Sequence, residues 1–266
     1  MTFFLKKIII DICKELNIKY KFISDEYITI LEKNKKIVYL NEYLFGLNSE
    51  VSSLLCDDKF AMYEVLKEFK IPVIEYKLIW HPGNTKEDIN NKINEIYKYY
   101  KEHHNHLVIK PNLGNSGINV YQIKNEKEIE SIFKDLLSKT NSICINPFYN
   151  IKNEYRVLML NNEVRFIYKK ELNNSWQFNL SKGSLAIKEI DNDLKNKIID
   201  LAKKTNKILK TNFVTIDIIQ DINNNLYILE VNSRVTMAKY IEQHKEDYEV
   251  VKKIYKDAIE ELFNSK

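Results

Sequence analysis

The sequence predicts an α+β protein, because helical and strand periodicities both occur along it. Apolar residues recur at helical spacing over residues 3–16, whereas apolar and polar residues alternate in YITILEK and KIVYL on either side of Asn34, as in a β-hairpin. Two longer hairpin patterns, EYRVLMLNNEVRFIYKK and VTIDIIQDINNNLYILEVN, follow in the second half of the chain. Amphipathic helices lie between and after these hairpins, which places the chain in the α+β class.

The other elements can be assigned in chain order. Asp57 and Asp58 begin a helix that ends before Pro72, and Thr85 with Asp88 resembles the capping box of a second helix. We then expect a strand at 106–110, the loop PNLGNSG, the strand INVYQI, a helix over 129–137 and the strand ICINPF. The first long hairpin follows, and after it a polar stretch to about residue 187 and a helix at 193–210. The second long hairpin and an amphipathic helix over 248–262 end the series.

The length of 266 residues allows one large domain or several small lobes. We expect a short N-terminal lobe at 1–56, a second lobe at 57–148 that contains the glycine loop, and a third lobe at 149–266 that contains both long hairpins.

Composition narrows the function classes. The 41 basic and 37 acidic residues give a formal net charge of +4, but both signs interleave and no aromatic and basic RNA-binding motif occurs, so we expect no nucleic-acid partner. No apolar run reaches about 18 residues, so we expect no membrane span. The three cysteines are widely spaced without a CxxC pattern, which favours reduced thiols over disulfides or zinc. Together these features predict a cytoplasmic protein.

The second long hairpin carries a candidate metal site. A turn centred on Asn223 and Asn224 pairs Asp217 directly with Glu230, and directly opposed residues have Cβ atoms about 4.5 to 5.5 Å apart. Two facing carboxylates on otherwise apolar strands need a positive charge between them, and a divalent cation is the simplest source. Asn232 adds a neutral oxygen on the same face, and this donor set suits Mg²⁺. The alternative is a solvated hairpin whose acidic side chains pair with lysines.

The loop PNLGNSG is a candidate phosphate site. Lys110 ends an apolar strand just before Gly114 and Gly117, whose unhindered backbone allows N–H groups to approach a phosphate. The P-loop, Rossmann and protein-kinase motifs are absent, so a nucleotide at this loop requires another kind of site. The alternative is an ordinary hairpin connection.

The first long hairpin gathers charges of both signs on one face. A turn at Asn161 and Asn162 predicts a face on which Glu154, Arg156, Leu158 and Leu160 lie opposite Lys169, Ile167, Arg165 and Glu163. Such a face suits a triphosphate and a reacting carboxylate, although an exposed salt-bridged ribbon would carry the same residues. The chain has only three arginines, and in so lysine-rich a sequence each one indicates a need for a planar, always-charged fork: Arg156, Arg165 and Arg234.

Taken in order, a set of segments resembles the ATP-grasp superfamily over roughly residues 48–235: DDKFAMYEVLKEFKIPVI, LVIKPNLGNSGINV, NEYRVLML, QFNLSKGS, VTIDII and LYILEVNSR. The sequence looks most like the carboxylate–amine ligases related to ribosomal protein S6 glutamate ligase, cyanophycin synthetase and D-alanine–D-alanine ligase. The resemblance implies an ATP-grasp fold, in which two α+β lobes grip ATP, with a short N-terminal lobe.

The resemblance also implies roles for particular residues. ATP would contact Lys59, Lys110, the glycine-loop residues Gly114, Asn115, Ser116 and Gly117, the adenine segment Pro147, Phe148 and Tyr149, and then Glu154, Lys169 and Asn179. Mg²⁺, expected as two ions and replaceable by Mn²⁺, would bind Asp217, Glu230 and Asn232. Arg156 and Arg234 match positions associated with the acyl phosphate or with developing negative charge, so we expect them to be catalytic.

The sequence departs from the family pattern in two places. Many relatives have proline soon after EVN, whereas this chain continues with Ser233, Arg234 and Val235, and Asn146 stands where an acidic or amide residue usually precedes the adenine segment. The first lobe is also short, which favours a partner subunit, such as a second copy in a homo-oligomer, or an open cleft.

The activity implied by the resemblance is ATP-dependent ligation of a carboxylate to an amine. Phosphorylation turns a carboxylate oxygen into a leaving group, and the amine then displaces phosphate. The partners would be a small-molecule carboxylate and amine, or a peptide or protein tail. Two alternatives remain open at this point: a kinase on the same scaffold, and a nucleotide-binding regulatory protein without turnover.

Overall fold

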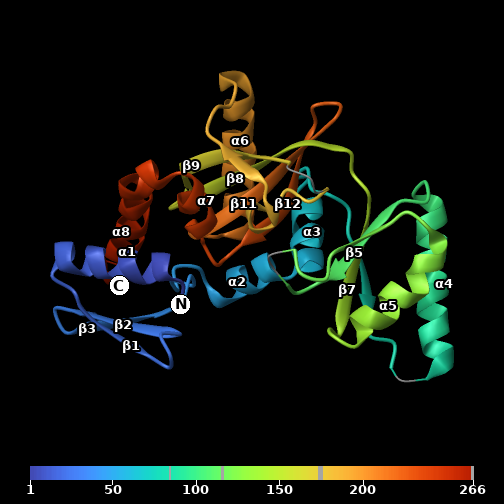
Figure 1. The fold of residues 1–266 in the computed structure, drawn as a ribbon, viewed down its shortest axis with the longest axis horizontal. Helices are drawn as coiled ribbons and strands as arrows, with labels where there is room; N and C mark the ends of the chain where they lie inside the picture. Colours follow the sequence, from blue (N-terminus) through green and yellow to red (C-terminus); the bar gives the residue numbers. More distant parts are fainter. Residues whose placement is uncertain (84, 115–116, 173–175, 265–266) are drawn as a thin grey trace.

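Three β-sheets follow one another along the long axis of the molecule. The computed structural model describes residues 1–83, 85–114, 117–172 and 176–264. The small N-terminal sheet and a four-stranded sheet lie at opposite ends, and a five-stranded sheet lies between them (Figure 1). The mixture of helices and antiparallel sheets confirms the predicted α+β class.

The N-terminal lobe is a helix packed on a three-stranded sheet. Its elements are α1 (Phe3–Leu16), β1 (Lys19–Ile23), β2 (Ile28–Lys33) and β3 (Lys36–Asn41). Thr2 caps the start of α1, and Asn17 ends it in the left-handed conformation. Leu5 and Leu31 share one hydrophobic cluster with Tyr255 of the C-terminal helix, and Figure 1 shows the two terminal helices side by side. The N-terminal lobe therefore shares its core with the C-terminus.

The four-stranded lobe carries its two helices on one face of the sheet (Figure 1). Its elements are β4 (Lys77–Trp80), α4 (Lys86–Glu102), β5 (Leu107–Pro111), β6 (Tyr121–Ile123), α5 (Ile129–Leu137) and β7 (Ser142–Pro147), with the strand order β4-β7-β5-β6. Ile96 of α4 and Phe133 of α5 are fully buried against the sheet. Thr85 caps α4 by accepting a hydrogen bond from the backbone N–H of Asp88, as the sequence predicts.

The five-stranded sheet has the order β10-β9-β8-β11-β12. Its strands and the helix inserted among them are β8 (Ile151–Leu160), β9 (Glu163–Glu171), β10 (Leu185–Ile187), α6 (Asn192–Leu209), β11 (Phe213–Asp221) and β12 (Leu226–Asn232). One cluster joins this sheet to α6 and to two earlier helices, α2 (Glu50–Asp57) and α3 (Lys59–Glu68). Met62 and Leu66 of α3 thus pack with Val157 and Ile216 of the large sheet. The helix after residue 57, which was expected in the second lobe, thus shares its hydrophobic cluster with the large sheet of the third.

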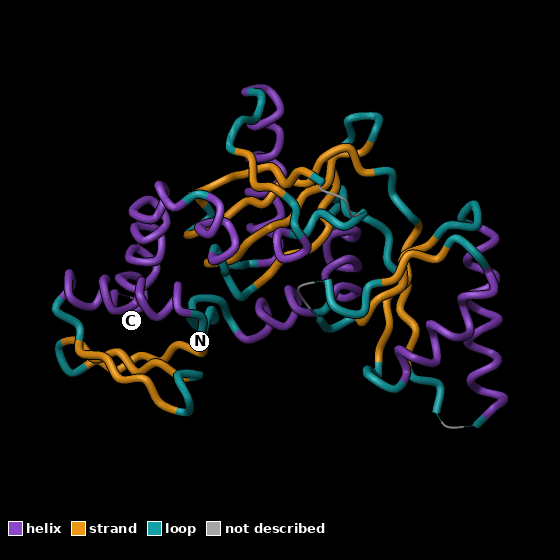
Figure 2. The backbone as a smooth tube through the Cα atoms, in the orientation of Figure 1, coloured by secondary structure: helices purple, strands orange, loops and turns teal. Residues whose placement is uncertain are grey.

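Loops rather than helices connect the large sheet to the four-stranded lobe. The connections are residues 69–76, between α3 and β4, and residues 148–150, between β7 and β8 (Figure 2). The chain ends with α7 (Ala238–Gln243) and α8 (Tyr248–Asn264). In the part of the chain that the structure describes, no helix has both the length and the apolar character needed to cross a membrane.

Most predicted elements are confirmed, and the differences are local. The hairpin around Asn34, the strand at 107–111 and the helices near 193–210 and 248–262 lie where the patterns indicate. The sequence analysis did not predict α2, β4, β10 or α7, and the strand expected from INVYQI is confined to Tyr121–Ile123.

We expect Asn48→Ala to lower the free energy of unfolding. Asn48 Oδ1 accepts hydrogen bonds from the backbone N–H groups of Asn212 (2.7 Å) and Phe213 (3.0 Å), and Asn48 Nδ2 donates to the Phe213 carbonyl, so this side chain attaches the N-terminal segment to the start of β11. Loss of these contacts should cost about 1 to 3 kcal/mol in urea unfolding. Asn90→Ala, on the exposed face of α4, is the matched control, and equal stability of the two variants would contradict the assignment.

Candidate functional site

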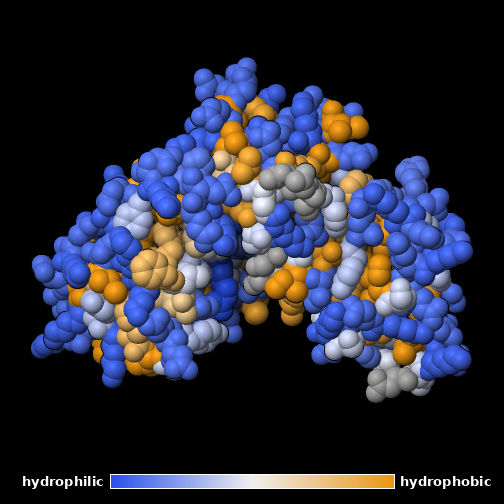
Figure 3. Space-filling view, in the orientation of Figure 1, coloured by the Kyte–Doolittle hydropathy of each residue, from blue (hydrophilic) through white to orange (hydrophobic). Residues whose placement is uncertain are grey.

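A cavity of about 1370 Å³ lies between the lobes and receives residues from the four- and five-stranded sheets, from α2 and α3, and from the segment that follows β3. Figure 3 shows the molecule hollowed between the N-terminal lobe and the four-stranded lobe. The cavity is lined by these predicted site residues: Lys59, Lys110, Gly114, Gly117, Phe148, Tyr149, Glu154, Arg156, Asn179, Glu230, Asn232 and Arg234. Asn115 and Ser116 lie outside the described residues. Pro147, Lys169 and Asp217 are not among the lining residues.

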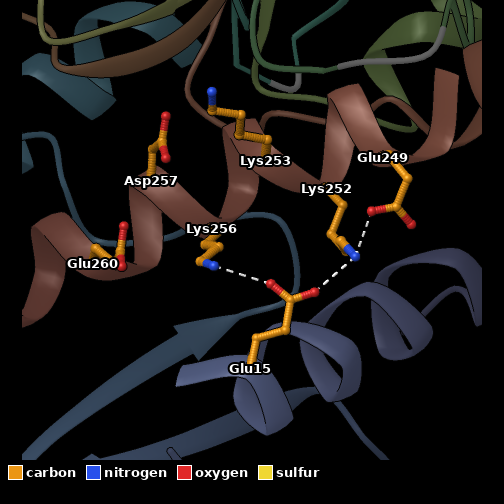
Figure 4. A pocket seen from close by; sticks show the side chains of 7 residues that line it. All are labelled: Glu15, Glu249, Lys252, Lys253, Lys256, Asp257 and Glu260. Atoms are coloured by element: carbon orange, nitrogen blue, oxygen red, sulfur yellow. Dashed lines mark hydrogen bonds and ion pairs between the residues drawn. The ribbon is translucent and has the colours of Figure 1, made fainter. Parts of the chain in front are cut away.

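A second hollow lies between α1 and α8 and is filled by mutual ion pairs. Glu15 binds Lys252 at 2.8 Å and Lys256 at 3.0 Å, and Lys252 also binds Glu249 (Figure 4). These charges satisfy one another, so we place the functional site in the large cavity.

Asp217 and Glu230 are directly paired on β11 and β12, as the sequence predicts. The register arises in a different way, however. Ile218 pairs with Ile228 rather than with Leu229, and a β-bulge at Leu229 restores the pairing of Asp217 with Glu230. Asn232 lies two residues beyond Glu230 and donates to it at 3.4 Å, so both side chains point to the same face.

Asp217 is held by two cationic side chains from neighbouring strands. Arg156 on β8 forms a bidentate pair with it, from Nε to Oδ1 (2.8 Å) and from Nη2 to Oδ2 (2.6 Å). Lys170 on β9 donates to Asp217 Oδ1 at 2.9 Å and also to Glu154. Asp217, Lys170 and Glu154 are at most 5% exposed. The positive charge needed near Asp217 is therefore supplied by the protein itself, and removal of one partner from such a buried set typically costs about 3 to 5 kcal/mol.

The two carboxyl groups of this cluster have opposite pKa shifts. Burial raises the pKa of Asp217, but the charges and hydrogen bonds of Arg156 and Lys170 outweigh it and hold that pKa well below its ordinary value. Burial, aided by repulsion from Asp217 and opposed by Lys170, raises the pKa of Glu154 to about 7. Asp217 thus keeps its negative charge at neutral pH, as a metal ligand must.

The register predicted for the first long hairpin holds next to the turn, where Leu160 pairs with Glu163, but is wrong beyond Met159. Leu158 pairs with Phe166 and Met159 with Val164, so Arg165 is the extra residue of a β-bulge. A shift of one residue exchanges the two faces of a strand. Lys170, which the sequence analysis did not single out, consequently stands opposite Glu154 and lines the cavity, whereas Lys169 pairs with Tyr155 and is not a lining residue.

Arg165 itself takes part in a different contact, because it forms an ion pair with Asp257 of α8. It therefore ties the sheet to the C-terminal helix.

The two candidate phosphate lysines are buried at the junction of the lobes. Lys59, the first residue of α3, donates to the carbonyl oxygens of Asn112 (3.2 Å) and Gly114 (2.7 Å) at the start of the glycine loop. Lys110 on β5 donates to the Tyr76 hydroxyl at 2.9 Å. Burial and the nearby charge of Lys59, opposed by Glu230, lower the pKa of Lys110 to about 8. Both lysines line the cavity, which concentrates positive charge where an anion would bind.

The glycine loop meets a segment from the large sheet across the cavity. Gly117 has a φ of +67°, and a Cβ at this position would lie 3.0 Å from Nδ2 of Asn179. Lys182 Nζ donates to the Gly117 carbonyl at 3.0 Å. The backbone conformation and the close approach of Asn179 therefore both favour glycine at this position.

The predicted adenine segment lies where the four-stranded lobe connects to the large sheet. Phe148 stacks on His106 with ring centroids 3.9 Å apart, and the Tyr149 hydroxyl accepts a hydrogen bond from the Glu75 backbone at 3.1 Å. Pro147 is the last residue of β7. Asn146 is buried and lines the cavity, and its Oδ1 has no hydrogen-bond partner among the described residues. A buried acceptor without a partner is costly unless a ligand satisfies it.

Arg234 lies at the other end of the cavity, next to the N-terminal lobe. Its Nη1 donates to the backbone carbonyl (3.2 Å) and to Oδ1 (3.1 Å) of Asn41. The preceding Ser233 donates to Asp57 Oδ1 at 3.2 Å. Arg234 therefore follows, along one stretch of chain at the end of β12, the metal-ligand candidates Glu230 and Asn232, and all three line the cavity.

We expect the affinity for an ATP analogue to weaken as the pH rises above about 8, because Lys110 loses its charge there. Lys110→Met should remove this pH dependence, together with much of the affinity. Isothermal titration calorimetry measures both quantities. Lys195→Met, which changes an exposed lysine on α6, is the control and should behave as the wild type; an unchanged pH dependence in Lys110→Met would contradict the role of Lys110.

Comparisons with known proteins agree with this geometry. A family model described as the RimK-like ATP-grasp domain matches residues 56–256. The structure of D-alanine–D-alanine ligase from Bacillus anthracis has a TM-score of 0.55 and 17% identity, with 78% of this chain and 72% of that one covered. VanG D-Ala:D-Ser ligase from Enterococcus faecalis has a TM-score of 0.56 and 16% identity, with 70% and 55% covered.

The ATP-grasp ligase PsnB, solved in complex with a minimal precursor, has a TM-score of 0.53 and 16% identity, with 73% of this chain covered. This chain spans 57% of the length of PsnB. The search of the curated proteins found no match. At these identities the structural likeness confirms the predicted ATP-grasp fold. Since the family model covers more than half of the sequence, the chain belongs to the RimK-like ATP-grasp family.

Proposed function

We propose that the protein is an ATP-dependent ligase that joins a carboxylate to an amine through an acyl phosphate. The observation that carries the proposal is the meeting, in one cavity, of the oxygen ligands Glu230 and Asn232 with the buried lysines Lys59 and Lys110. Carboxylate and amide oxygens suit Mg²⁺ shared with phosphates, and buried cationic side chains suit the phosphates themselves.

The donor set has room for a metal ion. An ionised carboxylate offers about four acceptor positions, and Asp217 uses three of them, for Arg156 Nε, Arg156 Nη2 and Lys170 Nζ. The remaining position would serve a metal ion that Glu230, which is paired with Asp217, and Asn232 also bind. When bound, Mg²⁺ offsets the negative charge that develops between the β- and γ-phosphates. Two such ions, or Mn²⁺ in their place, are part of the proposal.

The chain's own residues would bind and orient the nucleotide. Asn146 Oδ1 would accept a hydrogen bond from the adenine amino group, which satisfies its buried acceptor, and Phe148 would contact the base. Lys59 and Lys110 would hold the phosphates. The closeness of Gly117 and Asn179 supports phosphate contacts from both lobes. Such positioning is the main protein contribution to phosphoryl transfer.

The reaction would proceed in two displacements. A carboxylate oxygen attacks the γ-phosphorus, and the bond to the β–γ bridging oxygen breaks, which releases ADP. The amine nitrogen then attacks the acyl carbon, loses a proton, and expels inorganic phosphate as the carbon–oxygen bond breaks. Arg234, at the cavity end near the N-terminal lobe, would stabilise the tetrahedral oxyanion. Arg156 would keep Asp217 charged and in place throughout.

We expect release of ADP and phosphate to require ATP, Mg²⁺, a carboxylate and an amine, and to be lost in Glu230→Gln. Loss of a direct metal ligand should exceed the roughly 10- to 100-fold effect of indirect metal-site changes. Pooled amino acids, amines and peptides serve as substrates in a coupled ADP assay.

Glu189→Gln, on the exposed surface and outside the cavity, is the control for Glu230→Gln. Release of ADP in the absence of an amine would contradict the ligase proposal and indicate a kinase. Tight binding of Mg·ATP without release of ADP in any of the substrate pools would favour a nucleotide-binding protein without turnover.

A further inference from the structure

Tyr76 stands at the contact between the lobes without facing the cavity. It lies in the loop between α3 and β4, is 2% exposed, and is not a cavity-lining residue. Its ring packs edge-on against Tyr63 of α3, with ring centroids 6.3 Å apart. A buried tyrosine hydroxyl needs hydrogen-bond partners, and the partners of this one belong to the two lobes that form the site.

The Tyr76 hydroxyl forms a bridge between the lobes. It accepts a hydrogen bond from Lys110 Nζ (2.9 Å) in the four-stranded lobe and donates one to the Leu229 carbonyl (3.0 Å) in the large sheet. Lys110 Nζ also lies 4.8 Å from the centre of the Tyr76 ring, within the range of a cation–π contact. Position and direction of the lysine head group are thus set by one aromatic residue.

Leu229 is the bulged residue that precedes Glu230. It has no paired residue on β11, because the register passes from Ile228 opposite Ile218 to Glu230 opposite Asp217. Bulges re-aim the side chains next to them, and this one brings Glu230 opposite Asp217. The Tyr76 hydroxyl donates to the Leu229 carbonyl and so stabilises the bulge. This hydrogen bond therefore also influences the direction of the Glu230 side chain.

We propose that Tyr76 is a positioning residue that couples the phosphate lysine of one lobe to the metal-ligand strand of the other. The inference rests on the proposed function, since it assumes that Lys110 meets phosphate and that Glu230 meets the metal ion. One hydroxyl fixes both groups, so nucleotide affinity and the Mg²⁺ concentration needed for nucleotide binding depend on it together.

The test is a calorimetric titration of Mg²⁺ with a non-hydrolysable ATP analogue into Tyr76→Phe. The variant keeps the ring and its packing but removes both hydrogen bonds. The dissociation constant should rise about 10- to 100-fold, as for loss of a hydrogen bond to a charged group, and the Mg²⁺ concentration for half-maximal binding should rise with it. Unchanged binding would overturn the inference.

Tyr155→Phe is the matched control. Tyr155 is 1% exposed in the hydrophobic cluster that also contains Tyr76, and its hydroxyl donates to Gln220 at 3.0 Å, away from the cavity lining. Both variants should lose comparable thermal stability, but only Tyr76→Phe should bind the nucleotide more weakly. Equal weakening in the two variants would show that the effect is one of general stability and would overturn the inference.

A double-mutant cycle with Lys110→Met separates this inference from the proposed function. If Tyr76 acts through Lys110, Tyr76→Phe should weaken affinity clearly less in the Lys110→Met background than in the wild type, because only the hydrogen bond to the Leu229 carbonyl is then left to lose. A full effect in that background would overturn the coupling. A wild type that binds the analogue but never turns over ATP would overturn the ligase proposal alone, since the cycle measures binding only.

Discussion

A negative charge buried on β11, an inner strand of the large sheet, is the constraint on which the candidate site depends. Asp217 is 1% exposed, and a carboxylate so deeply buried is stable only with partners that match its geometry. Arg156 and Lys170 provide them from the next two strands, so three antiparallel strands must hold one register for the charge to be tolerated. The same arrangement keeps Asp217 ionised and directly paired with Glu230 on the neighbouring strand. Stability and the proposed metal binding therefore draw on the same side chains.

Two β-bulges decide which side chains of the candidate site share a face. The bulge at Arg165 brings Lys170, instead of Lys169, opposite Glu154, and the bulge at Leu229 brings Glu230 opposite Asp217. Each bulge is also held by a contact outside its own hairpin: Arg165 pairs with Asp257 of α8, and the Leu229 carbonyl accepts a hydrogen bond from Tyr76. The surrounding lobes thus influence the geometry of the site through the backbone of the sheet as well as through side chains that line the cavity.

Local patterns predicted much of the fold, because they report local physics. The capping side chain of Thr85, the tight turn at Asn34 and the amphipathic helices all depend on residues within a few positions of one another, and all are confirmed. The pairing of Asp217 with Glu230 was also predicted, although a displaced turn and a bulge compensate to produce it. Alternation alone carries no signal for the bulge at Arg165, which tertiary contacts decide, so Lys170 was missed in favour of Lys169. The short helix α2 was also missed, because its only local signal is one capping side chain, Ser49, and its position depends on packing beside the large sheet.

Activation of a carboxylate by phosphorylation in this cavity can be tested by trapping the acyl phosphate with hydroxylamine. Hydroxylamine attacks an acyl phosphate to give a hydroxamate, which mass spectrometry identifies even when the amine substrate is unidentified. With ATP, Mg²⁺ and pooled carboxylates, we expect a hydroxamate of one carboxylate, formed in proportion to the ADP released. Release of ADP without any hydroxamate, with the phosphate recovered on a hydroxyl group or as free phosphate from ATP hydrolysis, would contradict the proposed ligase chemistry.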